Sequence, residues 1–215
     1  MNKRLKTALS YIEGHTFLAD IGTDHAYLPI EAVRSGAVKQ AIASDLREKP
    51  FKRAKLNVEE AGLSTHIEIV KGNGLEVLET GVDVVSILGM GGMTIRDILS
   101  RGDLKHVEHI ILSPNSKPEV VRAWLEDHHF KIVDESFIRD NKHDYVIIVA
   151  QDGSMQLSQT EKEFGPCVIR KKQPDFVRMV ERKIAILKSA QKKTRSENER
   201  LRITSRLETL KELIE

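Results

Sequence analysis

The sequence predicts an α/β protein with a doubly wound, largely parallel sheet, an antiparallel hairpin at the end of that sheet, and a helical C-terminal part. Short apolar runs alternate with helical patterns over residues 1–150, which is typical of βα units. Two strand-like runs then follow one another closely, and after Asp152-Gly153 only helical periodicity remains. We therefore expect one domain over residues 1–157 and a second, basic helical domain over residues 158–215.

The strands of the expected sheet follow an opening amphipathic helix whose apolar residues lie at positions 5, 8, 9 and 12. Further helices are expected between the strands, among them residues 48–60 and the segment 119–128 after Pro118. The parallel strands are expected at Phe17–Asp20, Gln40–Ser44, Ile67–Lys71, Val84–Leu88 and Ile110–Ser113.

A hairpin is expected to close the sheet, from the runs Phe130–Ile138 and Tyr145–Gln151, because Asp-Asn in the link between them favours a turn. A parallel sheet with an antiparallel hairpin at its end is a mixed, doubly wound sheet. Sheets that bind NAD usually continue parallel at this point. The hairpin therefore favours the Rossmann-like sheet of methyltransferases.

Two long helices are predicted after Pro174, because apolar residues recur every three or four positions over 177–187 and again over 201–214. The link between them is polar, so we expect an antiparallel pair. Residues 161–215 hold 15 Lys and Arg against 9 Asp and Glu, whereas residues 1–160 hold 19 against 23. The basic part indicates an anionic polymer as partner. A solvated helical face and a dimerising coiled coil are the alternatives.

The turn Asp20–Tyr27 after the first strand is the most informative stretch of the chain. It keeps one glycine, Gly22, of the glycine-rich pattern that binds dinucleotides, and it has Asp24 where a second glycine would stand. A carboxylate there repels a diphosphate, whereas it suits S-adenosylmethionine, which carries a sulfonium, an ammonium and no phosphate. Asp24 is also a preferred residue for capping the following helix, and the two roles are compatible.

Three later strand ends carry residues that suit the same ligand. Asp45 lies about 20 residues beyond the turn, where an acid commonly binds ribose hydroxyls; the alternative is a loop acid or a helix cap. Asn73 is expected either to bind an adenine edge or to form a turn. The run Gly89-Met-Gly-Gly92 has more glycines than a turn needs, which indicates close approach of a ligand. A flexible loop is the alternative there.

Composition disfavours several classes of protein. The single cysteine, Cys167, excludes a disulfide framework and suits a reducing compartment. The adjacent pair His128-His129 points in different directions and is interpreted as surface, so no metal site is expected. No window is long and apolar enough to span a membrane. We expect a soluble, cytoplasmic protein with no membrane partner. The sequence leaves the oligomeric state open, with a monomer slightly favoured.

Five motifs then stand in the order of a known family. They are Asp-Ile-Gly-Thr-Asp-His-Ala-Tyr-Leu-Pro (20–29), Ala-Ser-Asp (43–45), Gly-Asn-Gly-Leu (72–75), Gly-Met-Gly-Gly (89–92) and Ser-Pro-Asn (113–115). Over its whole length the sequence resembles the bacterial tRNA (adenine(22)-N(1))-methyltransferases, the TrmK family. The resemblance implies a class I Rossmann-like methyltransferase domain, a coiled-coil-like helical domain, S-adenosylmethionine as cofactor, and an adenine in the D-arm region of tRNA as substrate. Asn73 and Ser113 depart from the family pattern, in which an acid and a glutamine are expected.

The expected site combines the turn, the strand ends and this resemblance. Catalytic roles are expected for Asp24, Gly89, Met90 and Asn115. The tRNA is expected to contact Tyr27, Lys171, Lys172, Lys192, Lys193 and Arg195. The cofactor is expected to contact Asp20, Gly22, Asp24, His25, Tyr27, Asp45, Leu46, Asn73, Gly74, Gly89 and Met90.

The chemistry of adenine N1 simplifies the expected reaction. Its in-plane lone pair is unprotonated at neutral pH, so transfer needs no general base and depends mainly on alignment. Tyr27 either stacks on a base or packs in its helix, and both remain open. The alternative functions are a class I methyltransferase with another substrate, such as rRNA, protein or a small molecule, and an RNA-binding protein that does not catalyse. An NAD-dependent enzyme is disfavoured by Asp24 and by the hairpin.

Overall fold

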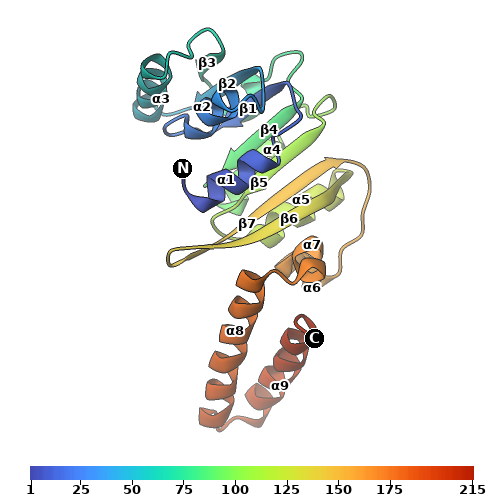
Figure 1. Ribbon diagram of the computed structural model, residues 1–215. Helices are drawn as coiled ribbons and strands as arrows, with labels where there is room; N and C mark the ends of the chain where they lie inside the picture. Colours follow the sequence, from blue (N-terminus) through green and yellow to red (C-terminus); the bar gives the residue numbers. More distant parts are fainter.

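A seven-stranded mixed sheet forms the body of the protein, in a computed structural model that describes residues 1–215 (Figure 1). The strand order is β3-β2-β1-β4-β5-β7-β6. The first five strands pair in parallel, and β7 and β6 are antiparallel. This arrangement confirms the predicted fold class. The strands are β1 Phe17–Ile21, β2 Gln40–Asp45, β3 Ile67–Lys71, β4 Val84–Leu88, β5 His109–Ser113, β6 Phe130–Asp140 and β7 His143–Asp152.

The order of the strands places a crevice beside β1. The chain moves outward from β1 through β2 to β3, and then returns across β1 to begin the other half of the sheet at β4. Connections on the two sides of β1 therefore leave in opposite directions. Open α/β sheets bind ligands at such a switch point, at the carboxyl ends of the strands.

Helices cover both faces of the sheet, because alternate side chains of each strand point to opposite faces. Leu18 and Val84 pack with α1, α2 and α3, whereas Ala19 and Val85 pack with η1, α4 and α5. The helices are α1 Lys3–Ser10, α2 Tyr27–Arg34, α3 Glu48–Glu60, η1 Gly74–Val77, α4 Gly92–Leu99 and α5 Pro118–Asp127.

The terminal hairpin is longer than expected from the sequence. The strands β6 and β7 continue to Asp140 and from His143, so only two residues join them, whereas a six-residue link was expected. Asn141 has φ 54°, a left-handed conformation that Asn tolerates well. The tight turn lets the ladder extend to its end.

Helices α6 Gln159–Phe164, α7 Pro166–Lys171, α8 Pro174–Lys193 and α9 Glu197–Glu212 form the C-terminal part. The last two form the predicted antiparallel pair, which projects away from the sheet (Figure 1). Gln191 Nε2 donates to Thr204 Oγ1 across the pair at 2.8 Å. No helix of the chain combines the length and apolar character that crossing a bilayer requires.

A buried ion pair joins the sheet to the C-terminal helices. Arg122 Nε and Glu135 Oε1 are 2.7 Å apart, and both side chains are almost fully buried. Arg122 also donates to the carbonyls at the end of α6, and Glu135 Oε2 accepts from the amide of Cys167 at the start of α7. The pair thereby satisfies helix-end groups that would otherwise be unpaired. Gly165 lies between the two helices with φ 96°, and a Cβ there would lie 2.4 Å from Glu135 Oε2.

Candidate functional site

Two neighbouring cavities at the carboxyl ends of β1, β2 and β4 form one crevice. Their volumes are about 400 and 540 Å³. They share Gly22, Arg47, Gly89 and Met90 as walls. Every residue that the sequence suggested for cofactor contact lines one cavity or the other. The structure therefore brings these residues together, while their individual roles stay predictions.

The turn after β1 does not offer its amides to a ligand. Both Gly22 N and Thr23 N donate to the carbonyl of Ser44 on β2, at 2.7 and 2.8 Å. A diphosphate would need such amides free. Gly22 has φ 77°, and a Cβ there would lie 1.7 Å from Met90 Cε. The Met90 side chain thus crosses over Gly22, where the two cavities meet.

Asp24 does not cap the helix that follows the turn, so the capping alternative was wrong. Helix α2 has Ala26 at its N-cap in a left-handed conformation, and Thr23 Oγ1 accepts from the amide of Ala26 at 3.1 Å. Asp24 is half exposed and lies 3.2 Å from Arg53 Nη1 and 3.4 Å from His25 Nε2. The guanidinium of Arg53 therefore partly neutralises the negative charge of Asp24 at the crevice.

Asp20 is a buried carboxylate on the wall of the smaller cavity. It is 6% exposed and accepts from Ser86 Oγ at 2.6 Å. Burial raises the pKa of Asp20, while hydrogen bonds from Ser86 and Thr23 and the charge of Arg4 act in the opposite direction. An ionised carboxylate that is only partly compensated favours a cationic partner.

Asp45, at the end of β2, lies on the wall of the larger cavity. It accepts from the backbone N of Arg47 at 2.7 Å and from its guanidinium Nε at 3.2 Å. Helix α3 begins with Arg47 at its N-cap and no side-chain cap. Asp45 is therefore part of a local turn and does not cap the helix. A ribose hydroxyl bound to Asp45 would donate to a carboxylate that also accepts from the exposed Arg47 side chain.

The loop Gly89–Gly92 is held against the loop after β5, so the flexible-loop alternative was wrong. Asn115 Nδ2 donates to Gly89 O at 2.5 Å, and Asn115 N donates to Met90 O at 2.8 Å. At Gly92, a Cβ would lie 2.2 Å from the carbonyl oxygen of Lys117. Packing between the two loops explains Gly92 without a ligand. Gly89 has φ 84°, a left-handed conformation that favours glycine. The backbone of the turn therefore accounts for this glycine without a ligand.

The aromatic residue of the turn lies at the surface. Tyr27 is 54% exposed, and its ring stacks on that of His25 with centroids 4.8 Å apart and planes 2° from parallel. The alternative of a packed helix residue was therefore wrong. Asn73 Nδ2 donates to Glu76 Oε1 at 3.3 Å. Asn73 lies on the wall of the larger cavity beside Gly74 and Leu46.

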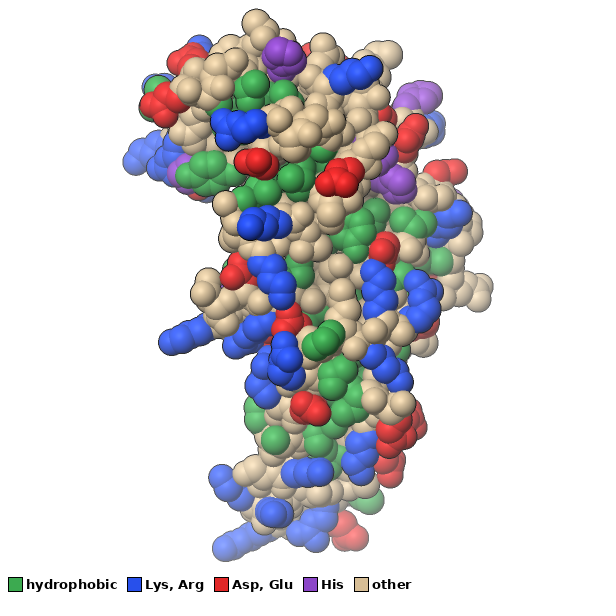
Figure 2. Space-filling view, in the orientation of Figure 1, with side chains coloured by type: hydrophobic (Ala, Val, Ile, Leu, Met, Phe, Trp, Pro, Cys, Tyr) green, Lys and Arg blue, Asp and Glu red, His purple; other side chains and the backbone are tan.

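The basic residues suggested for RNA contact lie in two places. Lys171 donates to Glu135 O at 3.0 Å and pairs with Asp134, so its ammonium is engaged within the protein. Lys172 ends α7. Lys192, Lys193 and Arg195 lie at the turn between α8 and α9, at the far end of the helical pair. Figure 2 shows Lys and Arg side chains gathered over this part of the molecule.

Several residues that line the crevice were not assigned by the sequence analysis, among them Arg4, Thr23 and Arg47. Arg4 comes from α1, which the sequence places before β1 without indicating that its first turn lies over the carboxyl edge of the sheet. Arg47 follows Asp45 directly, so its position could have been noted. No group of three His, Cys, Asp or Glu side chains is arranged to hold a metal ion.

The crevice fits S-adenosylmethionine better than a dinucleotide. The turn amides are engaged by Ser44, one buried carboxylate faces each cavity, and Arg4 Nε is buried with no hydrogen-bond partner. The smaller cavity therefore offers both an anion and a cation, which suits an α-amino acid. The larger one offers Asp45 for a ribose.

Comparisons with known proteins give a consistent result. The family model for tRNA (adenine(22)-N(1))-methyltransferase matches residues 18–215. The Bacillus subtilis tRNA (adenine(22)-N(1))-methyltransferase is 40% identical over 156 residues, which are 71% of this chain and 66%, just under two thirds, of that enzyme. Streptococcus pneumoniae Sp1610 in complex with S-adenosyl-L-methionine superposes with TM-score 0.89 at 37% identity, covering 100% of both chains. TrmK of M. capricolum in complex with S-adenosyl-homocysteine superposes with TM-score 0.84 at 31% identity, covering 100% of this chain and 97% of the other.

Proposed function

The chain belongs to the tRNA (adenine(22)-N(1))-methyltransferase family, and from this premise we propose that it transfers a methyl group from S-adenosylmethionine to N1 of an adenine in the D-arm region of tRNA, at position 22. Its partner is tRNA, and its place of action is the cytoplasm. The observation that carries the proposal is the crevice at the switch point, where Asp20 and Asp45 face two cavities that meet beneath Met90.

The donor is supported by what this crevice can and cannot bind. Asp20 is buried beside Gly22 and suits the cationic end of the cofactor, while Asp45 suits its ribose. The turn amides donate to Ser44 O, which disfavours NAD. S-adenosylmethionine, when bound, supplies a methyl group on a positively charged sulfur.

Alignment is the main catalytic task of the chain. Adenine N1 attacks with its own lone pair, so no residue needs to remove a proton. Positioning of this kind supplies roughly 7–11 kcal/mol at best. Asn115 holds the Gly89 and Met90 carbonyls by two hydrogen bonds. It thereby fixes the loop that borders the reacting groups.

The acceptor base has to leave its stack or pair, which costs a few kcal/mol. The exposed Tyr27, whose ring stacks on that of His25, lines the smaller cavity. An exposed aromatic face of this kind stabilises an unstacked base by about 1–3 kcal/mol. We assign Tyr27 to stacking on a tRNA base near the crevice.

The helical part, residues 158–215, is assigned to tRNA binding. Lys192, Lys193 and Arg195 form a cationic tip where α8 leads into α9, and this turn lies away from the sheet (Figure 1). Contact at both ends would hold a long, anionic polymer, and each phosphate contact makes binding weaken as salt rises. Lys171 contributes less, because its ammonium already contacts Glu135 O.

Transfer of a labelled methyl group from S-adenosylmethionine to bulk bacterial tRNA tests the proposal. We expect incorporation by the wild-type protein, and loss of both incorporation and S-adenosyl-homocysteine binding in Asp20→Ala and Asp45→Ala. Ribosomal RNA and a total protein extract serve as parallel acceptors. Incorporation into one of these and none into tRNA would replace the proposed substrate, and wild-type cofactor affinity in either variant would refute the assigned role of that carboxylate.

A further inference from the structure

Arg4 is a half-buried guanidinium that has no acidic partner. It belongs to none of the ion pairs of the protein, and its Nε is buried without a hydrogen-bond partner. Nη1 donates to Asn115 Oδ1 at 3.3 Å, and the guanidinium carbon lies 4.9 Å from the centroid of the Tyr145 ring. Buried charges are normally paired or fully hydrogen-bonded. A buried donor without a partner is therefore a candidate for ligand binding.

Arg4 lines the smaller cavity together with Asp20 and Gly22. The guanidinium also borders the loop after β4, because a Cβ at Gly89 would lie 3.5 Å from Arg4 Nη1. The cavity thus presents a buried carboxylate and a guanidinium that forms no ion pair to the same space. Such a pair is complementary to a zwitterion with an ammonium and a carboxylate close together.

The methionine end of S-adenosylmethionine is such a zwitterion, and its α-carboxylate is the only anionic group of the cofactor. We propose that Arg4 binds this carboxylate, while Asp20 binds the α-ammonium. The assignment rests on the proposed function in one respect, namely that the cofactor is S-adenosylmethionine. It gives the N-terminal helix a direct part in the cofactor site.

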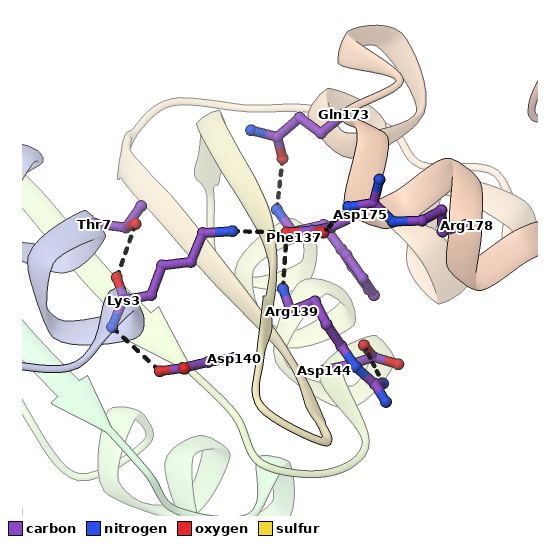
Figure 3. A network of polar contacts seen from close by, with 9 residues as sticks. All are labelled: Lys3, Thr7, Phe137, Arg139, Asp140, Asp144, Gln173, Asp175 and Arg178. Carbon is purple, nitrogen blue, oxygen red and sulfur yellow. Dashed lines mark hydrogen bonds and ion pairs between the residues drawn. The ribbon is translucent and has the colours of Figure 1, made fainter.

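The first turn of α1 is held in place by contacts on its other side (Figure 3). Lys3 N donates to Asp140 Oδ2 at 3.2 Å, and Lys3 Nζ lies 2.8 Å from Asp175 Oδ2 at the start of α8. Asn2 caps the helix by accepting from the amide of Leu5 at 2.9 Å. Arg4 is therefore positioned before any ligand binds, which reduces the entropy lost on binding.

The test compares two ligands that differ in the amino-acid end. S-adenosyl-homocysteine carries the α-carboxylate, whereas 5′-methylthioadenosine has the same adenosine and a thioether with no amino acid. We expect Arg4→Gln to bind S-adenosyl-homocysteine at least about tenfold more weakly, because a charge-assisted hydrogen bond is lost. Its affinity for 5′-methylthioadenosine should equal that of the wild type, both measured by isothermal titration.

Two further variants complete the design. Lys6→Gln removes a positive charge from an exposed position of the same helix and should leave both affinities unchanged. Arg4→Lys keeps the charge and should recover part of the preference for S-adenosyl-homocysteine. If Arg4→Gln fails to fold, the Arg4→Lys protein still gives the ratio of the two affinities.

Four results would overturn the assignment. If Arg4→Gln binds both ligands more weakly by the same factor, Arg4 acts on the shape of the site. Unchanged S-adenosyl-homocysteine binding with weakened tRNA binding means that the anion is a tRNA phosphate. An Arg4→Gln protein whose affinities for both ligands and for tRNA equal those of the wild type removes any role of the charge. Failure of the wild type to bind either ligand would refute the proposed cofactor itself.

Discussion

Asp20 carries the electrostatic character of the crevice at the scale of single residues. Its carboxylate is buried, and burial raises its pKa above the usual range of aspartate. Holding the ionised form therefore costs stability in the cofactor-free protein. A cationic ligand removes part of that cost, so the same residue that destabilises the fold favours binding.

The substitution Asp20→Asn separates these two effects. We expect the affinity for S-adenosyl-homocysteine to fall at least about tenfold. The free energy of unfolding without ligand should stay equal or rise by up to about 1 kcal/mol, because the amide oxygen can still accept from Ser86. Urea unfolding and isothermal titration measure the two quantities.

The difference in the free energy of unfolding between the wild type and Asp20→Asn should depend on pH with a definite sign. The folded pKa of Asp20 lies above its unfolded value, so the folded wild type gains protons first as pH falls. Its stability relative to Asp20→Asn should rise as the pH falls through the folded pKa of Asp20 toward the unfolded pKa, while its ligand affinity falls. Asp127→Asn, which changes an exposed carboxylate outside the crevice, is the control. A loss of stability in Asp20→Asn comparable to that of a core mutation would contradict this account.

Residues at strand ends were predictable, whereas residues that reach the crevice from elsewhere were not. Asp20, Gly22 and Asp45 follow apolar runs, and the carboxyl ends of parallel strands meet at one edge. The position of Arg4 depends on where α1 packs, which no local pattern encodes. The cap expected at Asp24 was wrong because Thr23 forms the local hydrogen bond and Ala26 adopts a left-handed conformation.

At the scale of elements, Asp175 ties three segments together. It lies at the start of α8 and contacts Lys3 of α1, the amide of Arg139 on β6, and Arg178 one turn further along its own helix (Figure 3). The hydrogen bond from Lys3, followed by that from Arg139, lowers the pKa of Asp175 to about 2. The helical pair is therefore attached to the helix that carries Arg4.

We expect Asp175→Asn to lower the free energy of unfolding at pH 7 by about 1–2 kcal/mol, allowing for solvent screening of a partly exposed pair. Because the folded pKa is depressed, this contribution is complete above the unfolded pKa near 3.8 and is lost as pH falls toward 2. Urea unfolding between pH 7 and pH 3 measures it. Asp140→Asn, at the other contact of Lys3, is a matched comparison. A difference that stays constant down to pH 3 would show that the charge of Asp175 is not responsible.

The sequence predicted element types better than their ends. Strand positions agree within a few residues, since apolar runs and β-branched residues define them. The break between α6 and α7 lies at Gly165-Pro166, two residue types that commonly interrupt helices. The buried pair Arg122–Glu135, which forms hydrogen bonds with the helix ends at that break, involves residues far apart in the chain and could not be foreseen.

At the scale of the whole molecule, the protein is elongated, with the sheet in one part and the turn between α8 and α9 at the opposite end (Figure 1). The domain boundary after residue 157 stays a prediction, as does the oligomeric state. The ion pair Arg122–Glu135 joins the sheet to α6 and α7, and Asp175 joins β6 and α1 to the start of α8. On the proposed role of the tip, these contacts would hold a bound tRNA in a defined direction from the crevice.

Replacing Lys192, Lys193 and Arg195 by Gln tests the role of the tip. We expect tRNA affinity to fall about tenfold or more near 0.15 M salt, and the dependence of affinity on salt to become less steep. Binding of S-adenosyl-homocysteine should not change. A variant with Lys39, Lys55 and Lys105 replaced by Gln removes the same charge from the sheet part. Equal tRNA affinity in the two variants would reject the tip as the binding surface.

The central claim is methyl transfer to adenine N1 at position 22 of tRNA. The most direct measurement is nucleoside mass spectrometry of an unmodified tRNA transcript incubated with the protein and S-adenosylmethionine, beside a transcript in which guanine replaces the adenine at position 22. The account predicts 1-methyladenosine in the first transcript and none in the second. A different methylated nucleoside, or equal 1-methyladenosine in both transcripts, would contradict it.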